Sequence, residues 1–285
     1  GIGLLRTEFL FMNRETPPDE EEQYATLRKL VEGMNGQPVT IRTLDIGGEK
    51  LAYSLGGHMA ESVNPALGLR AIRFSLRQPK LFESQISAIL RANAHGPIRM
   101  LLPMISTVGE VQEVRETSAR VRRRLRRRGM NVGDQMPPIG VMIEVPGAAL
   151  AADALAGVSD FFAVGTNDLT MYTLAIDRSD EQVAHLYDPL HPAVLRLIQF
   201  SAQAALRARI PISLCGEMAG DPRYTALLLG LGVRELSMSS ASLPRVKQQV
   251  RSLDLTASTR RAEMIMDQAD PNRIEMLLDD FNAQI

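Results

Sequence analysis

The sequence predicts an α/β protein with a parallel sheet, and specifically a (βα)8 barrel of the TIM type. Short apolar runs alternate with amphipathic stretches along the whole chain, which is typical of consecutive βα units. The runs are apolar throughout, as strands buried on both faces are. Five of the runs end at a charged or reactive residue. Candidates at the ends of many strands favour a barrel over an open doubly wound sheet, which gathers its functional residues at one switch point.

Seven strands are predicted, one fewer than a closed (βα)8 barrel contains. The chain opens on Gly1, Ile2 and Gly3 without an initiator methionine. We therefore expect a fragment of a longer protein from which the first βα unit is missing. We expect residues 1–285 to form a single barrel domain. The predicted strands are residues 2–6, 39–44, 98–103, 139–144, 161–165, 211–215 and 235–238.

The stretches between the strands carry helix signals. Two prolines followed by four acidic residues mark a helix start at 17–22, and this helix should run to Gly33. Gly129 is expected to end a helix that contains Val111. The tail, residues 254–285, reads as two helices separated by Pro271. The remaining predicted helices are residues 79–94, 148–156, 192–209, 224–231 and 243–253.

The composition excludes several classes of protein. The 285 residues are 45% hydrophobic and 23% charged, which is an ordinary globular balance. A net charge of −1 provides no field that would attract nucleic acid or a membrane, and the absence of tryptophan argues against base stacking. A single cysteine, Cys215, excludes an internal disulfide and fits a reducing compartment. No apolar stretch is long enough to span a bilayer. We expect a cytoplasmic protein that binds neither nucleic acid nor membrane.

Two carboxylates at strand ends, Glu144 and Asp168, are the candidate metal ligands. Oxygen ligands without histidine or cysteine companions favour Mg²⁺ or Mn²⁺ over Zn²⁺. The alternative is that both acids form ion pairs with nearby arginines. Metal-ligand spacing is absent from the histidines, which are His58, His95, His185 and His191.

Arginines near strand ends are the candidate anion ligands. A guanidinium binds phosphate or carboxylate oxygens bidentately and keeps its charge. Arg6 and Arg42 directly follow apolar strand residues, and the alternative for each is an ion pair with Glu8, Asp45 or Glu49. The full set of basic candidates is Arg6, Arg42, Lys50, Arg70, Arg73 and Arg178.

Two further basic features are interpreted structurally. Arg73 lies in a segment that starts a helix, so a structural role is favoured for it. The run Arg120–Arg128 could bind an acidic partner. However, Val121 and Leu125 fit a buried helical stripe, which makes a solvated helix face the better interpretation.

Polar residues also follow two later strands. Residues 165–168 form a tight strand-to-loop turn in which Asn167 and backbone N–H groups could bind an anion, although an Asx residue there often caps the next helix. Cys215 lies at another strand end, where a thiol could act as nucleophile or proton donor, or simply be buried in the core. Because no histidine adjoins it in the sequence, we favour acid–base work.

Six motifs occur in order along the chain, and together they are specific. They are GIGLLRTEFLFM at 1–12, RTLDIGGEK at 42–50, NPALGLR at 64–70, EVP at 144–146, GTNDLT at 165–170 with Tyr172 and Asp177-Arg178, and CGE at 215–217. In these motifs the chain resembles the C-terminal phosphoenolpyruvate (PEP)-binding domain of enzyme I of the bacterial phosphotransferase system. The resemblance covers essentially the whole chain and implies the PEP/pyruvate type of TIM barrel.

The resemblance also implies roles for the candidate residues. Glu144 and Asp168 would hold Mg²⁺, and Cys215 would protonate enolpyruvate at its methylene carbon. The implied ligands of the phosphate and carboxylate groups are Arg6, Arg42, Arg70, Asn167 and Arg178, with Lys50 assisting at the phosphate.

The implied activity is transfer of the phosphoryl group of PEP to a histidine on an absent N-terminal domain, and from there to an HPr-type phosphocarrier. The resemblance also implies a homodimer. Residues 214–221 and 190–192 favour the nitrogen-related paralogue over the sugar-transport one. Two alternatives remain open at this point. One is the C-terminal domain of a pyruvate phosphate dikinase or PEP synthase, and the other is a non-catalytic dimerisation module that senses PEP.

Overall fold

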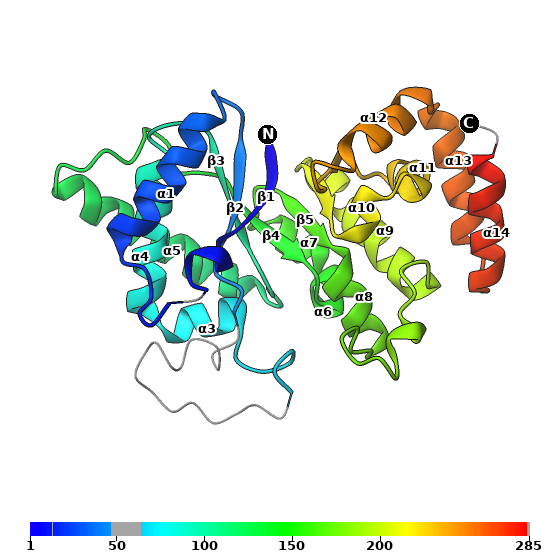
Figure 1. Cartoon of the computed structure of the whole chain (residues 1–285), viewed down its shortest axis with the longest axis horizontal. Helices are drawn as coiled ribbons and strands as arrows, with labels where there is room; N and C mark the ends of the chain where they lie inside the picture. Colours follow the sequence, from blue (N-terminus) through cyan, green and yellow to red (C-terminus); the bar gives the residue numbers. More distant parts are fainter. Residues whose placement is uncertain (13, 47–63, 284–285) are drawn as a thin grey trace. The chain divides into compact units, whose positions relative to one another are not determined.

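The structure is a computed structural model that describes residues 1–12, 14–46 and 64–283. Its strands alternate with helices along the chain (Figure 1). The strands follow one another in sequence order in a seven-stranded sheet, from β1 to β7. Neighbouring strands run parallel, as in the pairs β1–β2, β2–β3 and β5–β6. The predicted α/β class is therefore confirmed, and the sequential order is the one that a βα barrel has.

All seven predicted strands are present. The predicted second strand ends two residues early because the backbone leaves the ladder there: the Leu44 N–H donates to the Gln85 side chain and the Asp45 N–H to Glu8. The strands are β1 (Ile2–Arg6), β2 (Val39–Arg42), β3 (Ile98–Leu102), β4 (Ile139–Ile143), β5 (Phe162–Gly165), β6 (Ile212–Cys215) and β7 (Glu235–Leu236).

The contacts divide the chain into two compact units, Gly1–Val141 and Met142–Ile285. The prediction that residues 1–285 form a single domain stays a prediction. In the described part of the chain, no helix combines the length and the apolar character needed to cross a membrane.

In the first unit, helices α1 and α4 pack against each other. The α1 helix begins at Asp19, whose side chain forms a reciprocal capping box with Glu22. The α4 helix begins with Pro79 and buries an apolar face that includes Ile86 and Ile89. The helices of this unit are η1 (Thr7–Leu10), α1 (Glu20–Gly33), α3 (Ala71–Arg77), α4 (Pro79–Ala92) and α5 (Val108–Arg127).

In the second unit, proline lies in the first turn of five of the helices, as expected for a residue that fits this position. Gly230 lets helices α11 and α13 approach closely, because a Cβ there would lie 2.4 Å from the Ser258 carbonyl oxygen. The helices are α6 (Pro146–Leu150), α7 (Ala152–Ala156), α8 (Thr166–Leu174), η2 (Ala184–Leu186), α9 (Pro192–Ala208), α10 (Glu217–Gly220), α11 (Pro222–Gly230), α12 (Leu243–Ser252), α13 (Leu255–Met266) and α14 (Pro271–Asn282).

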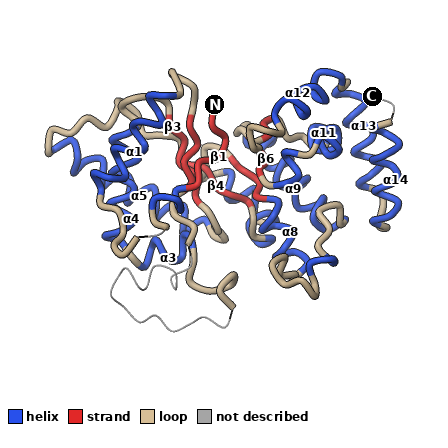
Figure 2. The backbone as a smooth tube through the Cα atoms, viewed as in Figure 1, coloured by secondary structure: helices blue, strands red, loops and turns tan. Residues whose placement is uncertain are grey.

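Two predictions about this unit need correction. The helix predicted over residues 148–156 consists of two short helices, because the backbone leaves helical geometry at Ala151. The tight strand-to-loop turn predicted at 165–168 does not form. Instead, helix α8 (Figure 2) begins at Thr166 directly after β5. Asn167 and Asp168 therefore lie in its first turn. A helix start at this position orients both side chains more rigidly than a loop would.

Candidate functional site

Four charged residues of the first unit form a compact group, which we call the arginine cluster: Glu8, Arg42, Asp45 and Arg70. Strands β1 and β2 end level with each other, since Arg6 is in register with Arg42. The residues that follow both strands therefore become neighbours. Arg42 binds Oδ2 of Asp45 at 3.0 Å and Oε1 of Glu8 at 3.2 Å.

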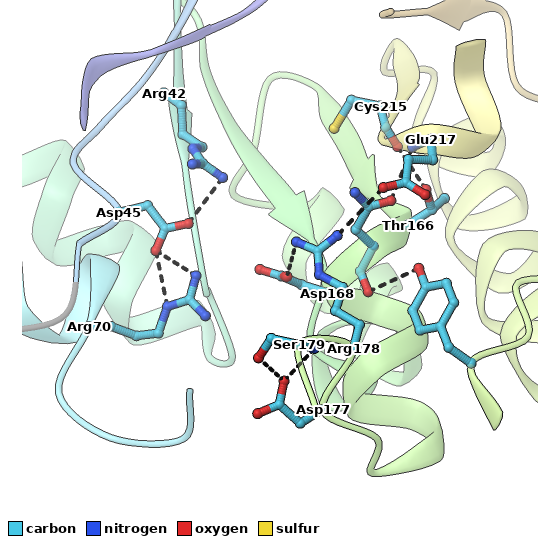
Figure 3. A network of polar contacts seen from close by, with 12 residues as sticks. Arg42, Asp45, Arg70, Thr166, Asp168, Asp177, Arg178, Ser179, Cys215 and Glu217 are labelled. Carbon is cyan, nitrogen blue, oxygen red and sulfur yellow. Dashed lines mark hydrogen bonds and ion pairs between the residues drawn. The ribbon is translucent and has the colours of Figure 1, made fainter. Parts of the chain in front are cut away.

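Asp45 is the centre of the arginine cluster. Its side chain is only 2% exposed, and it lies between Arg42 and Arg70 (Figure 3). Arg70 donates from Nε at 3.1 Å and from Nη2 at 2.9 Å to Oδ1 of Asp45. The ion pairs that the sequence left open as an alternative for Arg42 are thus formed. A guanidinium has five N–H donors, so a carboxylate partner leaves it able to bind a further anion.

The other basic candidates of this unit differ from the arginine cluster. Arg6 is exposed at the end of β1 and forms no ion pair with any described residue. Arg73 donates to the Leu67 carbonyl at 3.0 Å, in agreement with the structural role favoured for it. Lys50 and Glu49 lie outside the described residues.

The second unit contains a more open group, which we call the Asp168–Arg178 cluster: Asn167, Asp168, Arg178 and Glu217. Arg178 lies 4.0 Å from Oδ1 of Asp168 and 3.9 Å from Oε1 of Glu217. Its side chain is 43% exposed, and that of Glu217 is 82% exposed. Asn167 accepts a hydrogen bond from the Glu217 N–H at 3.0 Å, which ties the start of α8 to the start of α10.

Cys215 is held at the end of β6, opposite Gly165 of β5. Its side chain is buried, and the thiol donates to the Val164 carbonyl at 3.4 Å. Thr166 Oγ1 donates to the Cys215 carbonyl at 2.9 Å. Cys215 thus ends the strand that leads into α10, and the neighbouring strand β5 leads into α8; these two helices carry Asn167, Asp168 and Glu217 of the Asp168–Arg178 cluster.

Gly216 explains how the chain turns after Cys215. Its φ of +100° lies in a region that side chains disfavour. A Cβ at this position would lie 2.4 Å from Oγ1 of Thr166 and 2.8 Å from Oδ1 of Asn167. Only glycine lets the segment after β6 rest on these two side chains. Thr166 and Gly216 were not predicted as supports of Cys215, although they lie within the motifs GTNDLT and CGE.

The predicted metal ligands fit a hard divalent cation in chemistry. Glu144 follows β4 and is buried, and its Oε2 would lie 3.0 Å from a Cβ on Gly165. The absence of a side chain at Gly165 thus lets the end of β5 pack closely against this carboxylate, three residues before Asp168. Across the described ranges, no group of three or more histidine, cysteine, aspartate and glutamate side chains could hold a metal. Two carboxylates suit Mg²⁺, which fills the rest of its shell with water and phosphate oxygens.

Two pKa shifts accompany the Asp168–Arg178 cluster. Burial raises the pKa of Tyr187, whose hydroxyl donates to the Asn167 carbonyl at 3.4 Å, so it remains a neutral donor at neutral pH. Hydrogen bonds from Ser179 lower the pKa of Asp177. Asp177 is therefore a carboxylate directly beside Arg178 at neutral pH.

The basic run of α5 is largely used within the fold. Arg120 and Arg124 pair with Glu83, and the hydrogen bond from Arg124 lowers the pKa of that carboxyl. Arg122 and Arg126 donate to backbone carbonyls of residues 133 and 134. Arg127 and Arg128 are exposed. The interpretation of the run as a solvated helix face therefore holds for the exposed Arg127 and Arg128, whereas the four arginines named before them have partners within the fold.

Comparisons with known proteins give a consistent result. A family model described as PEP-utilising enzyme, PEP-binding domain, matches residues 1–255. A phosphoenolpyruvate-protein phosphotransferase of Cupriavidus necator is 49% identical over 94% of this chain and 45% of that protein. The protein of the same name from Haemophilus influenzae is 43% identical over 99% of this chain and 48% of its own length. The chain spans about half the length of the curated relatives it matches.

Among solved structures, a citrate lyase of Burkholderia xenovorans is similar in fold. It aligns with a TM-score of 0.51 over 94% of this chain and 81% of that chain. The sequence identity is 17%, so the likeness concerns the fold alone.

Proposed function

We propose, because the chain belongs to the PEP-binding domain family of the PEP-utilising enzymes, that it binds PEP with Mg²⁺ and supplies the phosphoryl group to a histidine elsewhere in a longer protein. The observation that carries this proposal is the arginine cluster. Two guanidinium groups are fixed on one buried carboxylate at the ends of the strands. A pair of oriented guanidiniums suits a substrate group with several anionic oxygens.

The basic residues bind and orient the substrate in this proposal. Arg42 and Arg70, with Arg6 and Lys50, bind the phosphate oxygens. Arg178 and Asn167 bind anionic groups of the substrate. Arginine donors stabilise the charge that develops on the transferring phosphoryl group, because they are oriented before the reaction begins.

Glu144 and Asp168 would hold the metal ion. When bound, Mg²⁺ supplies positive charge that neutralises phosphoryl oxygens. The chain's own contribution is two carboxylates, Glu144 directly after β4 and Asp168 in the first turn of α8, with Gly165 letting β5 approach Glu144 closely.

Cys215 would act as the proton donor. Loss of the phosphoryl group from PEP leaves the enolate of pyruvate, and the thiol proton is delivered to its methylene carbon to give pyruvate. The thiol already donates to the Val164 carbonyl, as only the protonated form can. Delivery of this proton leaves a thiolate that regains its proton from solvent.

The partners follow from the same proposal. The phosphohistidine would pass its group to an HPr-type phosphocarrier, in a cytoplasmic homodimer. The pathway would be the nitrogen-related branch or sugar transport. Incubation of the longer protein with PEP and the carrier should yield phosphohistidine on both. ATP-dependent formation of PEP from pyruvate would instead indicate a dikinase or synthase.

The first test is calorimetric titration of PEP into the chain with and without Mg²⁺. We expect Mg²⁺-dependent binding that Arg42→Ala abolishes. Arg28→Ala is the matched control, since Arg28 is an exposed arginine of the same unit that pairs with Glu32 on α1. Absence of binding by the unaltered chain, or equal losses in the two variants, would refute the proposal.

A further inference from the structure

A glutamine is buried on helix α4, next to the segments that carry Glu8 and Asp45 of the arginine cluster. Gln85 is 2% exposed, and it shares the buried face of α4 with apolar residues such as Ile86 and Ile89. A buried amide is unfavourable unless its donor and acceptor atoms are bonded. Both are: Nε2 donates to Oγ1 of Thr7 at 3.2 Å, and Oε1 accepts from the Leu44 N–H at 2.9 Å.

Both bonds reach residues next to Arg42, one through space and one along the chain. Thr7 is fully buried just after β1, and its Oγ1 donates to the Arg42 carbonyl at 2.9 Å. Leu44 follows Arg42 by two residues, where β2 has ended. Gln85 therefore joins the ends of β1 and β2 to helix α4, at the point where both strands leave the sheet.

The residues that come next in the two segments are the carboxylates of the arginine cluster. Glu8 follows Thr7, and its Oε1 accepts from the Asp45 N–H at 2.9 Å and from Arg42 at 3.2 Å. Asp45 follows Leu44 and binds both arginines. A shift of Thr7 or Leu44 would displace Glu8 or Asp45, and with it the guanidinium groups.

We propose that Gln85 and Thr7 are positioning residues that hold Arg42 and Arg70 ready to bind a phosphate group. The proposal rests on the proposed function in that these arginines are its phosphate ligands. The competing interpretation is that Gln85 only stabilises the fold, as a satisfied buried amide does. The two interpretations differ in whether its loss affects phosphate binding selectively.

A second buried glutamine provides a matched control. Gln23 on α1 is fully buried in the same unit, and its Nε2 donates to the Pro18 carbonyl at 3.1 Å. We expect Gln85→Leu to weaken PEP binding roughly tenfold, the equivalent of about one well-made hydrogen bond. Binding of pyruvate, which has no phosphate, should change less than about twofold. Gln23→Leu should leave both affinities within about twofold.

Thr7 tests the same connection by another route. Thr7→Val removes the hydroxyl at nearly constant volume and should weaken PEP binding. Thr7→Ser keeps the hydroxyl and should bind PEP as the unaltered chain does. This pair also decides the question should Gln85→Leu fail to fold. Equal effects of the two glutamine variants, equal losses for PEP and pyruvate, or no rescue by serine would overturn the proposal.

An NMR measurement separates this proposal from the proposed function. The side-chain Nε–Hε signals of Arg42 and Arg70 report how rigidly the guanidiniums are held, with no ligand present. We expect them to shift and broaden in Gln85→Leu and to be unchanged in Gln23→Leu. If the unaltered chain binds no PEP, the proposed function fails. The positioning proposal is overturned separately if the arginine signals are the same in both variants.

Discussion

The arginine cluster and the Asp168–Arg178 cluster both place arginine beside acidic side chains, but they differ in burial and in the distances between the charged groups. In the arginine cluster, a carboxylate that is 2% exposed binds two guanidiniums at 2.9–3.1 Å. In the other cluster, Arg178 is 43% exposed and lies 3.9–4.0 Å from its acidic neighbours. The first arrangement is fixed before any ligand arrives, whereas the second leaves Arg178 free to reorient.

The difference has an energetic consequence. Loss of one partner from a buried ion pair leaves an uncompensated charge, which is strongly destabilising. Exposed pairs contribute little, because water screens them and the side chains lose entropy. The two clusters should therefore respond differently to substitution. Variants of the arginine cluster should lose stability together with binding, and variants of Arg178 should lose binding alone.

The largest effect is expected for Asp45→Asn. The substitution leaves Arg42 and Arg70 without their shared negative charge, and we expect the free energy of unfolding to fall by about 3–5 kcal/mol. Urea denaturation followed by circular dichroism measures this change. Glu217→Gln is the control from the exposed cluster, expected to remain within about 0.5 kcal/mol of the unaltered chain. Similar losses for both variants would abolish the contrast between the clusters.

Gly216→Ala should have the next largest effect, because it tests the rigid part of the second unit. The added Cβ would meet Thr166 Oγ1 at 2.4 Å, at a φ of +100°. We expect a loss of about 1–3 kcal/mol. Gly147→Ala is the control, since nothing lies within 4 Å of its Cβ position. It should be neutral or slightly stabilising. An unchanged free energy of unfolding in Gly216→Ala would mean that the segment after β6 is not held rigidly.

Arg178→Gln should separate binding from stability. Because Arg178 is 43% exposed, we expect the free energy of unfolding of the variant to differ from that of the unaltered chain by less than about 0.5 kcal/mol. The affinity for PEP should nevertheless fall roughly tenfold, as for one lost charge-assisted hydrogen bond. Denaturation and calorimetry on the same preparation check both parts. A large loss of stability would show that Arg178 is held as tightly as Arg42.

The smallest effect is expected for Ser179→Ala. Ser179 lowers the pKa of Asp177 through hydrogen bonds to the carboxylate. These bonds favour the ionised form, so loss of the hydroxyl should move the pKa upward, toward its ordinary value. NMR titration of the Asp177 carboxyl carbon measures this shift. Thermal stability at neutral pH should fall only slightly, because the lost bond stabilises the ionised carboxylate but Asp177 is exposed and water screens the interaction. An unchanged pKa would show that the backbone N–H alone sets it.

Much of the fold could be predicted from periodicity. All seven predicted strands exist, because short, mostly apolar runs that alternate with helix signals are typical of a parallel sheet. The helix ends were also predictable where proline, acidic residues or glycine mark them. The break at Ala151 was not, since it lies inside a run of alanine and leucine that has no helix-breaking residue.

The candidate site could be predicted as a set of residues but not as a network. The spacing from Arg42 to Asp45 allowed an ion pair, yet nothing in the sequence indicated that Asp45 would also bind Arg70. The role of Gln85 could not be predicted, because a single polar residue on an apolar helix face gives no indication of its partners. Its partners, Thr7 and Leu44, lie 78 and 41 residues away. Such contacts arise only when the strands are brought together.

The burial of Cys215 has a practical consequence for measuring local dynamics. It is the only cysteine in the sequence, so a thiol reagent can label a single atom without competing signals. Because the thiol is buried, labelling proceeds only from transiently opened forms, as amide exchange does. The labelling rate divided by that of an unprotected thiol gives the equilibrium constant for opening at β6. The chain thus contains its own probe of how often this strand end becomes accessible to solvent.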